Sequence, residues 1–556
     1  MLRTTATRPI LYFVLLMACF CPPLQAQAPG LLGVDTPTPS RMPLLMPDDF
    51  SELKLVAWRV ERGELDPQNP LIEGEMPWDA GGAGIHGSVF KDPLDSRWKA
   101  YLVCTPAEFA PMSKAEPWKS DNAAYRRLCL FESNDGVHWT RPELSNESIG
   151  EHAKTNALFD LSQGVSAYPS VFVDPENREW PYAMIALREY QGSKAHGKPP
   201  QGNGYYRYRS KDGKKWEPLG KVQGSMNKWD LAFFYRQPEG GQVCYYRATG
   251  PRQATDHLPP YEDTPRRSIF RSTSRDGKAW LEDPDPTTAI TADELDHRDT
   301  QYQELVPLKV AGGYLAMVTM YHPLSQTLDL RMAASRDGRH WWFPDRVACL
   351  DNAPLGDYGG GMIWQSQNLI VEDKTLYVYY GATEGAHRQM ADSRIPSKRI
   401  NAMETIADKF TYFLPFNAAL CRAAWRVDRM YALASSAGGP SIGEAVTTAK
   451  DLSGKELWVD LRTRPAKKAS KPGFHEGYLQ VELLDKDGKP LASFSRADCA
   501  PSKGDREAVQ VKWTGGGAAP PNARQAKFYL MRAFLYGFEF RDARQNAPLP
   551  KGPAVP

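Results

Sequence analysis

The chain has 556 residues, of which 42% are hydrophobic and 24% charged, with 68 basic residues against 66 acidic ones and a formal net charge of +2. This length exceeds one ordinary domain and is ample for a buried core, so we expect two domains. The balanced charge offers no electrostatic footprint for a phosphate backbone, and we expect no nucleic-acid partner. The 15 Trp, 25 Tyr, 44 Gly and 46 Pro residues favour strands and turns over a helical bundle.

Residues 1–28 have the parts of a secretory signal peptide. Two arginines in "MLRTTATRP" precede the apolar run "ILYFVLLMACF", and "LQAQA" offers small residues for cleavage. The apolar run is shorter than the roughly 20 residues that a spanning helix requires, and no later stretch approaches that length. We therefore expect a secreted or periplasmic protein without an integral membrane span. Lipid anchoring at Cys19 is the less favoured alternative.

One turn motif recurs four times in the chain. It reads "SNDGVHW" from Ser133, "SKDGKKW" from Ser210, "SRDGKAW" from Ser274 and "SRDGRHW" from Ser335. Asp-Gly favours a hairpin because Gly accepts positive φ and Asp bonds the backbone two residues on, while the Trp can cover the gap to a neighbouring sheet. Each motif follows short alternating strand patterns, and "NLIVEDKTLYVYYGATEGAHR" repeats the strands without the motif. The repeats predict an all-β fold in which five four-stranded blades form a β-propeller over residues 75–420.

The SxDGxxW turns, strand openings such as "VFVDP" and the late "LYVYYGATEGAHR" resemble the five-bladed β-propeller glycosidases, the superfamily of the invertase-like and arabinanase-like families. The resemblance implies a carbohydrate substrate and hydrolysis by paired carboxylates at the mouth of the central channel. It also implies an Asp on the first blade as base or nucleophile, another Asp on a middle blade as a positioning group, and a Glu on a following blade as acid.

The composition shifts after residue 420. The segments "ELWVDLRT", "GYLQVELLDKDGKPLASF", "AVQVKWTG" and "AKFYLMRAFLYGFEF" have the period-two character of strands. They predict a β-sandwich over residues 421–545, with an N-terminal lead-in at 29–74 and a tail at 546–556. This arrangement is similar to the C-terminal sandwich of many secreted bacterial propeller glycosidases. The residues leave open whether it binds sugar or supports the propeller.

The six cysteines after the signal peptide show neither CxxC nor zinc-ligand spacing. Buried thiols with one or two disulfides are therefore expected, and Cys104 with Cys129 is the favoured bridge because both fall in the first repeat. We expect no cofactor and no catalytic metal. The oxygen-bearing side chains of the channel leave room for a structural calcium.

Side chains at the start of each blade's first strand converge at one mouth of a propeller channel. By blade position, the resemblance assigns Asp79 as base or nucleophile, Asp230 as the positioning carboxylate and Glu304 as acid. Each has a structural alternative: Asp79 could cap a turn, Asp230 could be a paired strand residue, and Glu304 could face outward with Asp299 acting in its place. The predicted sugar contacts are His86, Trp229, Asp299, Tyr302, Gln365 and Gln367.

These patterns predict a secreted glycoside hydrolase acting on a poly- or oligosaccharide. The alternative is a non-catalytic propeller that binds carbohydrate or protein, because a fold does not dictate a function. Two carboxylates close together in a channel pocket favour hydrolysis, whereas a mouth lined only by aromatic and amide groups favours binding.

Overall fold

The computed structural model describes residues 42–106, 126–160, 163–188, 203–229, 231–237, 240–249, 267–297, 299–354, 356–387, 417–436, 441–465 and 476–543. Within these ranges the secondary structure consists of β-strands and 3-10 helices of three or four residues, so the predicted all-β class is confirmed. The predicted signal peptide and C-terminal tail lie outside these ranges. Among the described residues, no helix has the length and apolar character needed to cross a bilayer.

Five groups of antiparallel strands follow one another between residues 82 and 426. They are β4 (Gly82–Lys91), β5 (Trp98–Thr105), β6 (Arg127–Ser133) and β7 (Trp139–Thr140); β8 (Val165–Val173), β9 (Tyr182–Arg188), β10 (Gly204–Ser210) and β11 (Glu217–Lys221); β12 (Ala232–Arg236), β13 (Gln242–Thr249), β14 (Arg267–Ser274) and β15 (Leu281–Glu282); β16 (Gln301–Val310), β17 (Gly313–His322) and β18 (Thr327–Ser335); and β19 (Met362–Glu372), β20 (Thr375–Thr383) and β21 (Ala418–Arg426). Strands β5 and β6 are buried along their whole length. Burial on both faces explains why their sequences are apolar runs rather than alternating patterns.

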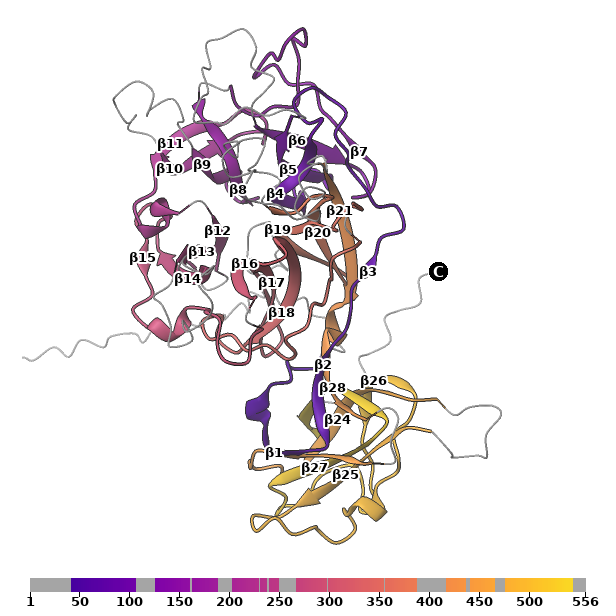
Figure 1. The fold of residues 1–556 in the computed structure, drawn as a ribbon. Helices are drawn as coiled ribbons and strands as arrows, with labels where there is room; N and C mark the ends of the chain where they lie inside the picture. Colours follow the sequence, from indigo (N-terminus) through magenta and orange to yellow (C-terminus); the bar gives the residue numbers. More distant parts are fainter. Residues whose placement is uncertain are drawn as a thin grey trace, which may run out of the picture.

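The first strands of the five groups contact one another in a closed ring. Strand β4 contacts β8, β8 contacts β12, β12 contacts β16, β16 contacts β19, and β19 contacts β4. Figure 1 shows these strands around a common centre, with the later strands of each group farther out. Single parallel bridges also join neighbouring groups, from Leu328 to Met362 and from Ala418 to Gly82. Side chains from all five first strands are thereby brought to one axis.

The recurring turn links neighbouring groups through its glycine carbonyl. Three hydrogen bonds of 2.6 to 3.1 Å make this link: Tyr379 Oη to Gly136 O, Tyr101 Oη to Gly213 O, and Tyr245 Oη to Gly338 O. Each donor lies on the second strand of one group, and each acceptor lies in the turn of the next. A β-carbon on Gly136 or Gly213 would lie 2.6 Å from the tyrosine oxygen, and both glycines have positive φ. Glycine is therefore required for space as well as for its backbone conformation.

Residues that precede the first group complete the fifth. Strand β3 (Glu64–Leu65) pairs with β21, and Leu71 donates its backbone N–H to Leu420 O at 2.7 Å. Arg422 on β21 donates to Asp66 through Nε at 2.9 Å. The chain thus joins its early and late segments in one sheet, which protects the edge that the fifth group would otherwise expose.

Two further antiparallel sheets combine strands from both ends of the described chain, with the orders β1-β23-β27-β25 and β2-β22-β28-β24-β26. Their strands are β1 (Phe50–Lys54), β2 (Val56–Val60), β22 (Tyr431–Ser435), β23 (Gly443–Thr447), β24 (Lys455–Thr463), β25 (Tyr478–Leu484), β26 (Asp505–Gln510), β27 (Gln525–Met531) and β28 (Ala533–Asp542). One hydrophobic cluster joins the two sheets, with Val481 and Phe528 from one and Leu461 and Leu535 from the other. Residues 50–60, assigned from sequence to a lead-in, therefore pair with the C-terminal strands.

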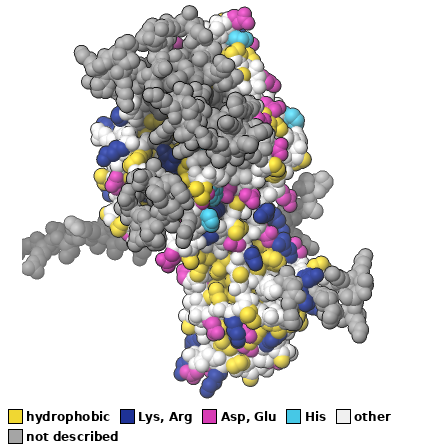
Figure 2. Space-filling view, in the orientation of Figure 1, with side chains coloured by type: hydrophobic (Ala, Val, Ile, Leu, Met, Phe, Trp, Pro, Cys, Tyr) yellow, Lys and Arg dark blue, Asp and Glu magenta, His cyan; other side chains and the backbone are white. Residues whose placement is uncertain are grey.

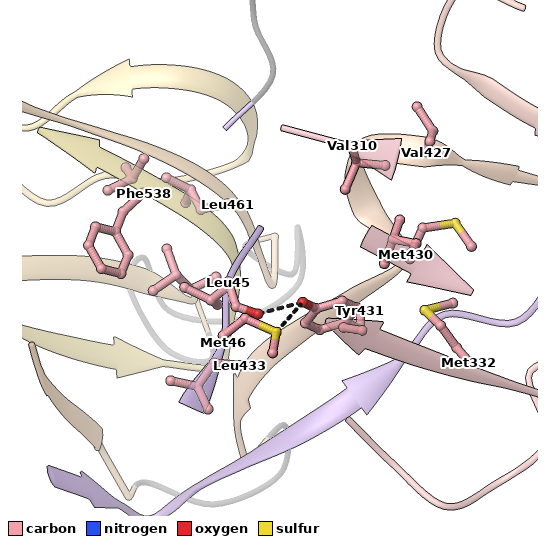
Figure 3. Close-up of a cluster of buried hydrophobic side chains, with 14 of the residues drawn as sticks. Leu45, Met46, Val310, Met332, Val427, Met430, Tyr431, Leu433, Leu461 and Phe538 are labelled. Carbon is pink, nitrogen blue, oxygen red and sulfur yellow. Dashed lines mark hydrogen bonds between the residues drawn. The ribbon is translucent and has the colours of Figure 1, made fainter. Parts of the chain in front are cut away.

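The same cluster continues into the five-group region, where the N-terminal segment runs between the two parts. Figure 3 shows Leu45 and Met46 among side chains of both parts, with Tyr431 Oη donating to Leu45 O. Arg336, in the fourth turn motif, donates to Leu44 O at 2.8 Å and to Asp49 Oδ2 at 2.7 Å. The two parts therefore share a core as well as polar contacts.

On the face shown in Figure 2, basic and acidic side chains are interspersed over the described surface. This agrees with the near-neutral net charge of the sequence.

The six described cysteines are all buried and free. The predicted disulfide between Cys104 and Cys129 is wrong for this structure, although burial and the adjacent Cys129 raise the pKa of the Cys104 thiol. Strand register pairs Cys129 with Leu102 and Cys104 with Arg127, so the two cysteines are diagonal neighbours. Diagonal pairs have Cα atoms about 7–8 Å apart, which exceeds the ordinary disulfide range.

The turn geometry yields a stability prediction. Ser335 Oγ is buried, accepts from Gly338 N at 2.9 Å and donates to Asp337 Oδ1 at 3.0 Å. We expect Ser335→Ala to lower the free energy of unfolding by about 1–2 kcal/mol, because the turn N–H loses its acceptor. Urea denaturation measures this value, with the exposed Ser325→Ala as control. Equal stability of the two variants would contradict the assignment.

Candidate active site

One buried histidine is contacted by a side chain from each of the other four first strands. The ring of His86 on β4 lies 4.5 Å from that of Tyr168 on β8, 6.4 Å from Phe233 on β12 and 4.5 Å from Trp364 on β19, measured between centroids. Its Nδ1 is 2.9 Å from Glu304 Oε1 on β16. His86 is 5% exposed. The predicted sugar contact His86 and the predicted acid Glu304 are thus brought together on the axis of the ring.

The Glu304 carboxylate is engaged at both oxygens. Oε1 faces His86 at ion-pair distance, without the alignment of a full hydrogen bond. Oε2 accepts a hydrogen bond of 2.9 Å from Thr319 Oγ1, and Gln365 Nε2 donates to the same threonine oxygen at 3.0 Å. The Glu304 side chain is fully buried. A carboxylate in such surroundings is unfavourable unless it is paired, and these side chains supply the partners.

The first strands are irregular where these side chains meet. The pairing register shifts between Ala83 and Gly87 in β4, Val165 and Ser170 in β8, Tyr302 and Glu304 in β16, and Gln365 and Leu369 in β19. His86 and Tyr168 have φ of 57° and 52°. Bulges redirect side chains, and a left-handed backbone in a residue other than glycine costs on the order of 1 kcal/mol or more. Regular strand pairing is therefore interrupted in four of the five first strands where these side chains meet.

Strand β19 carries buried polar atoms that need a partner. Among the described residues, Trp364 Nε1, Gln365 Oε1 and both amide atoms of Gln367 have no hydrogen-bond partner. Gln365 is 0% exposed and Gln367 2% exposed. Each buried unsatisfied polar atom costs about 1–3 kcal/mol, so these atoms require water or a ligand. Amide and indole groups of this kind hydrogen-bond hydroxyl groups.

Asp79, the predicted base or nucleophile, is held in a turn. Its Oδ1 accepts the backbone N–H groups of Glu75 at 2.8 Å and Met76 at 2.7 Å, and its Oδ2 accepts Arg141 Nε at 2.9 Å. Asp79 is 0% exposed. These contacts correspond to the turn-capping alternative, and they do not bring Asp79 to Glu304.

Asp299 and Tyr302 are bound within the fourth group. Asp299 Oδ1 accepts the backbone N–H of Leu324 at 2.7 Å, and Tyr302 Oη donates to Asp296 at 2.9 Å. Tyr302 packs on Phe343 with ring centroids 5.5 Å apart, and burial and Asp296 raise its pKa. The tyrosine thus belongs to the core between the third and fourth groups.

The middle-blade aspartate, Asp230, lies outside the described residues, so its predicted role stays a prediction. Its neighbour Trp229 is half-buried and follows the 3-10 helix η4 (Ser225–Lys228). Trp229 packs against the hydrophobic cluster between the second and third groups. The contacts described for Trp229 are those of packing.

Sequence reasoning missed three members of the centre: Tyr168, Phe233 and Thr319. Thr319 stands on a second strand, as a threonine within the apolar run "LAMVTM", and that position was the available signal. Tyr168 and Phe233 lie on first strands, but their aromatic character did not distinguish them from packing residues. A bulge, which sequence patterns do not reveal, lies at Tyr168 in β8, whereas β12 brings Phe233 to His86 with regular pairing.

The structural calcium stays a prediction. Calcium takes six to eight oxygen ligands, with carboxylates prominent among them. Within the described ranges, no group of three or more His, Cys, Asp and Glu residues could hold a metal ion. The axial carboxylate, Glu304, is already engaged by Thr319 and His86.

No family profile matches the sequence, and no curated protein matches it. Solved structures do match. One described as "Glycoside hydrolase" has 16% identity and a TM-score of 0.39, covering 66% of this chain and 92% of that one. One described as "a thermostable family-43 glycoside hydrolase" has 14% identity and a TM-score of 0.39, covering 67% and 97%.

A third match, described as "The GH130 family of mannoside phosphorylases contains glycoside hydrolases that target beta-1,2 mannosidic linkages in Candida mannan", has 12% identity and a TM-score of 0.42, covering 69% of this chain and 96% of that one. These structures are named glycoside hydrolases. The resemblance to glycosidases inferred from the turn motifs stays a prediction.

The contacts of Asp79 yield a second prediction. Removing one partner of a buried ion pair is strongly destabilising, so we expect Asp79→Asn to lower the free energy of unfolding by about 3 kcal/mol, and Arg141→Met to do likewise. Because the two residues are in contact, a double-mutant cycle should show coupling between them. Chemical denaturation measures both. If Asp79→Asn unfolds with the same free energy as the wild type, the predicted catalytic role of Asp79 is the better assignment.

Proposed function

We propose that this protein is a secreted glycoside hydrolase that cleaves a glycosidic bond of a poly- or oligosaccharide at the axis of the ring, with paired carboxylates of which Glu304 is one. The observation that carries the proposal is the convergence of side chains from all five first strands on His86 and Glu304. A carboxylate held beside a proton-transferring imidazole is suited to charge development in an oxocarbenium-like transition state.

The second carboxylate is assigned to Asp230. In the sequence it lies two residues before β12, and β12 brings the Phe233 ring to 6.4 Å from that of His86 between centroids. Asp79 already accepts hydrogen bonds from three donors on its two oxygens. Asp230 is therefore favoured over Asp79 as the second carboxylate. Hydrolysis requires one group to protonate the leaving oxygen and another to activate water or attack carbon.

We also propose a five-bladed propeller with a β-sandwich, and secretion of the protein. The five groups with their ring of first strands are taken as five blades of a propeller, and the two sheets that share a core as a β-sandwich. The charged, apolar and small-residue parts of segment 1–28 support secretion into the periplasm or the medium.

A carbohydrate-binding propeller without catalysis is the second candidate. The full burial of the Glu304 side chain favours it, because a catalytic carboxylate must reach the substrate or act through another group. The aromatic rings and unsatisfied amides at the centre suit sugar binding equally well.

Charge removal at Glu304 separates the two candidates. We expect Glu304→Gln to fold normally and to lose about 10³-fold or more in kcat, with Asp230→Asn similarly impaired. The matched control is Glu372→Gln, which changes a partly exposed glutamate paired with Lys91. Activity is measured by screening the purified protein on plant and algal polysaccharides and on 4-nitrophenyl glycosides. Glycan binding without turnover by the wild type would establish the second candidate instead.

A further inference from the structure

The Glu304 carboxylate lacks a free face for a substrate. Oε2 accepts from Thr319, Oε1 faces His86 Nδ1, and the side chain is 0% exposed. A group that protonates a leaving oxygen must come within about 2.6–3.2 Å of it. Direct donation from Glu304 would therefore require its described contacts to break.

His86 is placed to act in its stead. Its Nδ1 lies 2.9 Å from Glu304 Oε1, which leaves Nε2, on the other side of the ring, as the second proton-transfer atom of the imidazole. Tyr168 and Trp364 flank the ring at 62° and 60° to its plane, so the orientation of the imidazole is fixed by packing as well as by charge. A carboxylate that orients a histidine and stabilises its protonated form is an established catalytic arrangement in other enzymes.

We infer that His86 is the group that transfers the proton to the leaving oxygen, and that Glu304 acts through it as a positioning and charge-stabilising residue. The inference rests on the proposed glycosidase function and deepens it. It departs from the sequence-based assignment of Glu304 as the acid itself.

The proposed step is a proton transfer from His86 coupled to cleavage of the glycosidic bond. The glycosidic C–O bond breaks with its electron pair going to oxygen, and that oxygen takes the proton from Nε2 of the imidazolium. Neutral His86 keeps its Nδ1 proton toward Glu304. Water supplies the hydroxyl group to the sugar carbon, and its released proton restores the imidazolium. No oxidant, metal or further reactant is required.

The backbone of His86 supports a functional role. Its φ of 57° lies in the left-handed region, and the neighbouring Gly84 and Gly87 have φ of 118° and 157°. Asn, Asp and His tolerate left-handed φ better than other side chains. The groups that face His86 from the packed strands are the Glu304 carboxylate, the Tyr168 phenol, and the rings of Phe233 and Trp364.

The test is leaving-group dependence. His86→Asn accepts the left-handed backbone and retains an N–H donor near Nδ1, but it has no counterpart of Nε2. We expect it to lose about 10²–10⁴-fold in kcat/KM on alkyl glycosides and less than about 10-fold on 2,4-dinitrophenyl glycosides, whose leaving group needs no proton. His138→Asn, the same change at a histidine with a 76% exposed side chain, is the matched control.

Each outcome bears on the inference. Equal losses by His86→Asn on both substrates would show a structural role and overturn it, as would leaving-group dependence in Glu304→Gln alone. If His86→Asn does not fold, His86→Gly keeps the permitted backbone. Added imidazoles of graded pKa should then restore activity according to their acidity, and absent rescue overturns the inference. A wild type that cleaves no glycoside defeats the proposed function, whereas an active wild type with unimpaired His86→Asn defeats only this inference.

Discussion

Five first strands contact one another in a closed ring, and the contact between His86 and Glu304 exists only while that ring holds. The two residues stand in different groups and far apart in the chain. The hydrogen bonds from second-strand tyrosines to turn glycines repeat the same connection between neighbouring groups, so the recurrent turn contributes to the geometry of the axis from a distance. A small error in the placement of one group would separate the imidazole from the carboxylate.

The centre combines several features that are individually unfavourable. It has a buried carboxylate, two non-glycine residues with positive φ, bulges in four first strands, and buried polar atoms that lack described partners. A non-glycine residue with positive φ and a buried unsatisfied polar atom each cost about 1–3 kcal/mol in an ordinary core. The surrounding sheets, with fully buried strands such as β5 and β6, supply the hydrophobic stabilisation that offsets them. Strain of this kind gathers where structure serves binding or chemistry.

The N-terminal segment ties the molecule together at three places. Residues 42–46 lie between the two parts, β1 and β2 join the C-terminal sheets, and β3 completes the fifth group. The C-terminal sheets share their hydrophobic cluster with the fourth and fifth groups. The C-terminal sheets therefore pack against the groups that carry Glu304 and Trp364.

The sequence by itself determined the strand class, the repeating unit and three members of the centre, His86, Glu304 and Gln365. Local chemistry decides these: Asp-Gly forces a turn, alternation marks a strand, and an acidic residue in an apolar first strand stands out, as Glu304 does. Only the tertiary structure decided which candidates meet. Asp79 and Tyr302 were also predicted as site residues. In the structure Asp79 is held in a turn and Tyr302 in the hydrophobic core. His86, predicted as a sugar contact, lies in the middle of the site because the bulges of β4 turn its side chain toward the axis. A periodic sequence pattern does not reveal such bulges. Convergence depends on how five separate sheets are arranged around that axis, and this arrangement is a property of long-range packing that no local stretch of sequence encodes.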